Sequence, residues 1–97
     1  MTPTIMVVED EPAIMELLRV NLADAGYDVR GAADAESAQR MLNETLPDLL
    51  LLDWMLPGMS GLAFAKQLRG DARTRELPVI MVTARTDEAD KVAGLEA

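Results

Sequence analysis

The sequence predicts an α/β fold in which short parallel strands alternate with helices. Three short apolar runs, at residues 5–8, 49–52 and 79–82, are separated by segments with helical spacing of apolar residues. Each run ends in polar residues, which are acidic after the first two runs and Thr83-Ala84 after the third. Because parallel strands bring their carboxyl ends to one edge of the sheet, these polar side chains are expected to meet there.

Composition narrows the class of protein. The 97 residues suffice for one small domain at most, and the 49% hydrophobic content argues for a packed core. A net charge of −8 with scattered basic residues argues against nucleic-acid binding by this segment. Without Cys or His, disulfides, thiolate zinc sites and imidazole bases are excluded. No signal peptide or apolar run of membrane-spanning length is seen, so a cytoplasmic protein without membrane contact is expected.

The first helix is predicted directly after the first strand. Pro12 suits a first helical turn, with Asp10 or Glu11 as the expected N-cap, and Gly26 supplies the stop. Residues 27–31 are apolar only at alternate positions, which predicts a strand at the edge of the sheet. The residues at helical spacing before Gly26 are Ile14, Leu17, Leu18, Leu22 and Ala25.

The middle of the chain continues the alternation. A second helix is expected to begin at Asp34 and to end before Pro47, with Ala38, Met41 and Leu42 on one face. The run at 49–52 is apolar at every position, as in a strand covered on both faces. Pro57-Gly58 marks a turn directly after that strand.

The last predicted elements are a third helix, a fourth strand and a fourth helix. Ser60 is expected to cap the third helix, which stops near Gly70, and Pro78 precedes the fourth strand. The third helix buries Phe64, Ala65 and Leu68. A fourth helix is expected from about Glu88. The sequence stops within this helix, so the domain is expected to be incomplete at its C-terminus.

The acidic residues predict a metal site. Two like charges ~5 Å apart cost about 3 kcal/mol at an effective dielectric of 20, so clustered carboxylates need a cation. Oxygen ligands without His or Cys favour Mg²⁺ or Mn²⁺ over Zn²⁺. Glu9, Asp10, Asp53 and the Thr83 hydroxyl therefore predict a metal-dependent aspartyl phosphorylation site. Taken alone, Asp10 or Glu11 is better explained as a helix cap than as a metal ligand.

Three segments carry a resemblance to a known family. Residues 7–12, 51–58 with Gly61, and 81–85 resemble the receiver domain of bacterial two-component response regulators. The string Asp-Trp-Met-Leu-Pro-Gly at 53–58 is most similar to phosphate-regulon regulators of the OmpR/PhoB winged-helix class. The resemblance implies a flavodoxin-like (CheY-like), doubly wound parallel sheet of order 2-1-3-4(-5). Residues 1–97 would form the receiver domain, with strand 5 and helix 5 missing.

The resemblance also implies roles for individual residues. Asp53 would accept the phosphoryl group, and Asp10 and Asp53 would ligate Mg²⁺ together with the backbone carbonyl of Met55. Glu9 would bind the metal through a water molecule. The Thr83 hydroxyl and the Ala84 backbone N–H would contact the phosphoryl group. Residues implied in switching or at a dimer surface are Trp54, Glu88, Lys91, Val92, Leu95 and Glu96.

The resemblance implies a signalling role. A sensor histidine kinase would donate the phosphoryl group, and the fourth-helix face would then form a homodimer. DNA binding would belong to a further C-terminal domain, and the chain would assist only its own phosphorylation and dephosphorylation. The family's Lys at the end of strand 5 is absent, and neither Lys66 nor Lys91 occupies a matching position.

Two other functions remain open from the residues. A Mg²⁺-dependent phosphatase with an aspartyl-phosphate intermediate needs a second acid two positions after the nucleophile, where this chain has Met55. A pseudo-receiver would keep the fold as a scaffold without accepting phosphate, which the intact acidic set disfavours.

Overall fold

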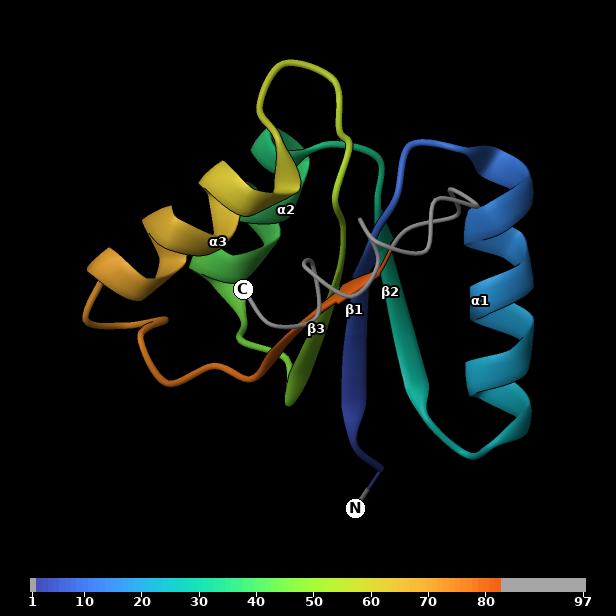
Figure 1. Cartoon of the computed structure of the whole chain (residues 1–97). Helices are drawn as coiled ribbons and strands as arrows, with labels where there is room; N and C mark the ends of the chain where they lie inside the picture. The colour runs from blue at the N-terminus through green and yellow to red at the C-terminus, as the bar shows by residue number, and fades with distance from the viewer. Residues whose placement is uncertain (1, 83–97) are drawn as a thin grey trace.

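The computed structural model describes residues 2–82, and these form a single parallel sheet between two layers of helix (Figure 1). The sheet has the order β2-β1-β3-β4, which confirms the expected order for these strands. Helix α1 covers one face, and α2 and α3 cover the other (Figure 1). The elements are β1 (Thr4–Val8), α1 (Pro12–Asp24), β2 (Asp28–Ala32), α2 (Ala35–Glu44), β3 (Leu49–Asp53), α3 (Gly61–Gly70) and β4 (Val79–Val82).

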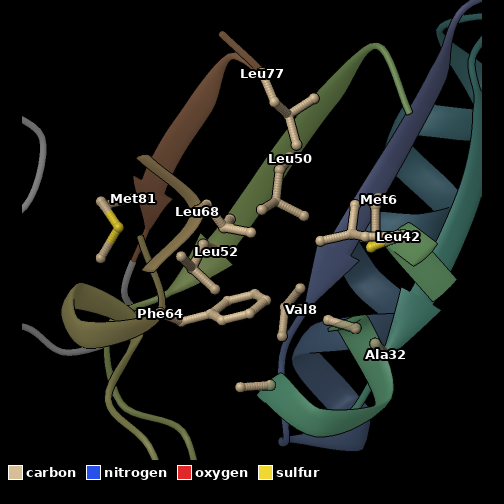
Figure 2. Packing of buried hydrophobic residues seen from close by; sticks show 12 residues of the cluster. Met6, Val8, Ala32, Leu42, Leu50, Leu52, Phe64, Leu68, Leu77 and Met81 are labelled. Carbon is tan, nitrogen blue, oxygen red and sulfur yellow. The ribbon is translucent and has the colours of Figure 1, made fainter. Parts of the chain in front are cut away.

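The larger core cluster lies between the sheet and the α2–α3 layer (Figure 2). Phe64 of α3 is 1% exposed and points between Leu52 and Val8, which come from different strands. Leu42 of α2 packs beside Met6 of β1 (Figure 2). Successive strand residues point to opposite faces, so Met6, Val8, Leu50 and Leu52 share this side. The α2–α3 side is therefore closely filled.

Fewer residues are buried on the α1 side of the sheet. The buried residues there are Ile5, Val7 and Leu51, and half-buried residues such as Leu18 pack against them. The apolar stripe predicted for the first helix is only partly in contact with the sheet, since Leu17 is 61% exposed. A single helix contacts a sheet along a narrow strip of its surface, and the predicted apolar stripe is wider than this strip.

The predicted cap of α3 is confirmed, and the residue at which α2 was expected to begin is its N-cap. The N-cap position of α1 falls on one of the two expected residues but lacks the capping hydrogen bond. Asp34 accepts a hydrogen bond from the Ser37 N–H at 2.7 Å, and Ser60 accepts one from the Ala63 N–H at 3.1 Å. At the start of α1 the N-cap residue is Glu11, whose side chain makes no capping hydrogen bond. The Glu11 N–H instead donates to Glu9 Oε2 at 3.0 Å, which ties the residue before α1 to the buried acid at the end of β1.

Strand boundaries differ slightly from expectation. Strand β2 lies at the edge of the described sheet, as predicted, but begins at Asp28 rather than Tyr27 and ends at Ala32. Gly26 has φ +101°, a left-handed conformation that suits glycine directly after a helix. The predicted fourth helix from Glu88, with Lys91, Val92, Leu95 and Glu96, lies outside the described residues.

Candidate metal centre at the carboxyl edge of the sheet

Two strand ends carry the acids Glu9 and Asp53 to neighbouring positions. The β1–β3 register pairs Val8 with Leu52, so the next residue on each strand lies at the same level. Side-chain alternation then turns Glu9 and Asp53 toward the same face, that of Val7 and Leu51. Sequence reasoning placed both acids at one edge, and the register explains why they also share a side.

Backbone hydrogen bonds continue past both strand ends and hold the acids in place. The Glu9 N–H donates to the Ala32 carbonyl at 2.9 Å, and the Trp54 N–H donates to the Val82 carbonyl at 3.0 Å. Glu9 is thus tied to β2 and the residue after Asp53 is tied to β4. The positions of the two acids follow from the sheet itself.

The carboxylates of Glu9, Asp10 and Asp53 converge. One oxygen from each lies within 4.8 Å of the others; Glu9 and Asp53 are buried and Asp10 is exposed. Two oxygens on opposite sides of a Mg²⁺ ion are about 4.2 Å apart, so the cluster has the size to surround one ion directly or through water. Oxygen donors without His or Cys suit Mg²⁺ or Mn²⁺, in agreement with the expectation from sequence.

Burial makes the metal-free cluster electrostatically unfavourable. The pKa of Glu9 is raised from its ordinary 4.5 to about 7, mainly because burial removes its hydration. The hydrogen bond from the Glu11 backbone opposes this rise, and the charges of Asp53 and Asp10 add to it. Burial also raises the pKa of Asp53, although the Met55 N–H favours its charged form. When protonated, Glu9 donates a hydrogen bond to Asp53. The charged forms of the two acids therefore disfavour each other, and a cation between them would relieve this.

The loop after Asp53 is closed on itself. The Gly61 N–H donates to the Trp54 carbonyl at 2.7 Å, which joins the start of α3 to the end of β3. A Cβ at position 61 would lie 2.0 Å from the Asp53 carbonyl oxygen, so only glycine allows this approach. In the sequence, the only indication of this contact is that a glycine directly follows the predicted cap of the third helix. The close approach to the Asp53 carbonyl itself depends on the tertiary structure.

The structure describes only two of the remaining predicted site residues, Trp54 and Met55. Trp54 is half-buried against the larger core cluster, and Met55 lies in the same loop with its side chain 55% exposed. The metal-binding role of the Met55 carbonyl stays a prediction. Thr83, Ala84 and Glu88 lie outside the described residues, so their roles also stay predictions. Across residues 2–82, no helix has the length and hydropathy needed to cross a membrane.

A family model described as the response regulator receiver domain matches residues 5–97. The chain is 52% identical over 96 residues to the phosphate regulon transcriptional regulatory protein PhoB of Klebsiella pneumoniae, covering 99% of this chain and 42% of that protein. It thus spans less than half the length of that relative.

Solved structures agree in fold. The chain superposes on a response regulator from Chloroflexus aurantiacus with a TM-score of 0.90 and 38% identity, covering 99% of this chain and 79% of the other. It superposes on the chemotaxis response regulator CheY4 of Vibrio cholerae with a TM-score of 0.85 and 29% identity, covering 97% and 78%. The flavodoxin-like fold expected from the sequence is confirmed.

Proposed function

The chain belongs to the response regulator receiver domain family, and we propose that it is a Mg²⁺-dependent phosphorylation switch with Asp53 as the acceptor. Receiver domains bind Mg²⁺ at an acidic pocket, and those of transcriptional regulators are generally not enzymes. The observation that supports the proposal is the convergence of three carboxylate oxygens within 4.8 Å at the carboxyl edge of the sheet. Glu9 and Asp10 would hold the ion with Asp53, assisted by the Met55 carbonyl.

The chemistry follows from the position of Asp53. One carboxylate oxygen attacks the phosphorus atom of a phosphohistidine, a new P–O bond forms and the P–N bond breaks. The departing imidazole nitrogen keeps the electron pair and takes up a proton. Bound Mg²⁺ supplies positive charge that lowers the repulsion between the phosphoryl oxygens and the acids. Asp53 is held by strand β3, so the protein contributes mainly orientation.

The wider role is proposed from the relatives. Regulators similar to PhoB interact with histidine kinases and carry a DNA-binding domain. We propose that a sensor histidine kinase phosphorylates Asp53 in the cytoplasm, and that residues 1–97 act as the receiver part of a regulator of phosphate-starvation genes. Phosphorylation would promote a homodimer through the predicted fourth helix, with Thr83 and Ala84 contacting the phosphoryl group.

Phosphorylation mapping tests the acceptor. The protein is incubated with Mg²⁺ and acetyl phosphate, and the modified residue is located by mass spectrometry. We expect one phosphoryl group on Asp53, none in Asp53→Asn and none without Mg²⁺. The matched control is Asp48→Asn, since Asp48 accepts a hydrogen bond from the Thr4 N–H at the opposite edge of the sheet. Labelling at another residue would overturn the assignment, and rapid turnover of unrelated phosphomonoesters would favour a phosphatase.

A further inference from the structure

A cavity separate from the acidic cluster lies between helices α2 and α3 and the loop that precedes α3. Its volume is about 610 Å³, and residues 57–59 of the loop form one wall. Figure 1 shows α2 and α3 side by side beneath this loop. The size lies within the range of small-molecule sites, roughly 300–1,000 Å³. None of Glu9, Asp10 and Asp53 lines it, so it is distinct from the candidate metal centre.

The lining combines an apolar interior with a negative rim. Ala35, Met59 and Phe64 supply apolar surface, whereas Asp34 and Glu36 supply carboxylates. Among the described residues that line the cavity, none is Lys or Arg. The cavity at the opposite edge of the sheet differs, because Arg73 and Arg75 there balance Asp48 and Glu76. The charged side chains that line the α2–α3 cavity itself are therefore all acidic.

Both rim acids also serve helix α2, so their effect on a ligand must be weighed. The Ser37 N–H donates to Asp34 Oδ1, and this hydrogen bond lowers the pKa of Asp34 and keeps the group charged. Glu36 is 3.7 Å from Arg40, whose charge also lowers the pKa of Asp34, so one cation beside the cavity already offsets part of the rim charge. The helix N-terminus adds the equivalent of roughly half a positive charge. Together with Arg40 it offsets most of the charge of the two carboxylates, and the rim keeps a small net negative charge.

The amides of two glutamines complete the cavity. Gln67 Nε2 donates to Gln39 Oε1 at 3.3 Å and links α3 to α2. An amide oxygen that accepts one hydrogen bond has a second lone pair and can accept another from a ligand N–H. Polar acceptors and carboxylates thus surround an apolar interior, which defines the kind of molecule that fits.

We propose that this cavity binds a small organic cation, with one ammonium or guanidinium group at the Asp34–Glu36 rim and an apolar body against Met59 and Phe64. The ligand would also act on the metal centre, because Met55 belongs to the same closed loop as residues 57–59. This effect on the metal centre rests on the proposed function. The ligand would shift Mg²⁺ affinity, and Mg²⁺ would shift ligand affinity by the same factor.

A titration with benzylammonium tests binding in metal-free protein. We expect saturable amide shifts in ¹⁵N–¹H spectra that concentrate on Ala35, Gly58 and Phe64. Benzylammonium is small, so millimolar affinity is expected, and benzyl alcohol should bind at least about fivefold more weakly. Shifts that do not saturate, or equal binding of the neutral analogue, would overturn the proposal.

Charge-removing variants test the rim. The double variant Asp34→Asn, Glu36→Gln should weaken benzylammonium binding at least about fivefold, while Asn retains the helix cap. Glu16→Gln on α1 is the matched control, since Glu16 is an exposed acid paired with Arg19 at 2.9 Å. It should leave binding unchanged. Equal loss in both proteins would indicate non-specific attraction to an acidic chain and would refute the site.

A separate experiment tests the link to the metal centre. The Mg²⁺ concentration at half-saturation is measured with and without benzylammonium, and we expect a change of at least about twofold. Asp53→Asn should still bind benzylammonium but show no such coupling. Binding without coupling would refute the effector role alone. Absence of Mg²⁺ binding would contradict the proposed function and leave the benzylammonium result to decide the cavity.

Discussion

The carboxyl of Glu9 has the largest electrostatic consequence at the scale of single residues. It is 4% exposed and its pKa is raised to about 7 by burial and by nearby acids. A carboxyl that titrates near 4.5 in the unfolded chain and near 7 in the folded chain makes the native state bind more protons between these values. Stability must then fall as pH rises through this window, and flatten above it.

The pH dependence can be measured in metal-free buffer. We expect the free energy of unfolding to fall by about 2 kcal/mol between about pH 5 and pH 7. Glu9→Gln should remove most of this slope, because a neutral amide titrates at neither pH. Urea unfolding at several pH values provides the measurement. The exposed-acid control Glu16→Gln should keep the slope, and a flat wild-type profile would contradict the raised pKa.

The charge of Asp53 repels the nearby carboxylates of Glu9 and Asp10, so removing it should change stability. Asp53→Asn should raise metal-free stability by about 1 kcal/mol, less than the full repulsion because Glu9 is partly protonated at pH 7. The variant should also lose most of the stabilisation that Mg²⁺ gives the wild type. Thermal melts with and without Mg²⁺ provide the measurement. Unchanged melting in both conditions would mean that these acids do not share one ion.

At the scale of elements, the junction between β3 and α3 depends on one glycine. Gly61→Ala would drive a Cβ to within 2.0 Å of the Asp53 carbonyl oxygen, with backbone on both sides that cannot move aside easily. We expect a loss of about 3 kcal/mol and weaker Mg²⁺ binding, because the strand end carrying Asp53 would shift. Urea unfolding and Mg²⁺ titration report the two effects.

The same helix offers the control. Gly70 lies at the last position of α3 and a Cβ there would meet nothing within 4 Å. Gly70→Ala should be neutral or slightly stabilising, since alanine has the higher helix propensity. Similar losses in both variants would show that the cost at position 61 comes from helix chemistry rather than from the close approach to Asp53.

Element boundaries show what local chemistry can and cannot predict. Ser60 caps α3 as expected, and Asp34, where the second helix was expected to begin, caps α2, because capping involves only residues two or three positions apart. Helix α1 also begins at Pro12 with Glu11 at the N-cap position, as expected, but the expected capping hydrogen bond does not form. The Glu11 N–H donates instead to Glu9, which lies there only because the sheet has fixed the end of β1. The sequence could place the acids at one edge, but the burial of Glu9 and the raised pKa depend on strand register and neighbouring strands.

At the scale of the whole molecule, the two faces of the sheet are unequally packed. The α2–α3 side contains Leu42, which is 0% exposed, whereas α1 has no fully buried residue. In the part of the chain that the structure describes, Ile80 of β4 is 41% exposed. Helical periodicity predicted apolar stripes on every helix, but a stripe does not show how much of it finds a partner. That depends on which elements cover each face.

This inequality predicts different costs for the same chemical change. Leu42→Ala should destabilise the domain by about 3–5 kcal/mol, since a fully enclosed side chain leaves a cavity that its neighbours cannot fill. Leu18→Ala, on the half-buried stripe of α1, should cost about half as much, because water and side-chain movement fill the space. Urea unfolding with Mg²⁺ present provides both values, and an unchanged slope with urea confirms two-state behaviour. Equal costs would show that the α1 face is as tightly enclosed in solution as the α2–α3 face, which would require more cover than residues 2–82 provide.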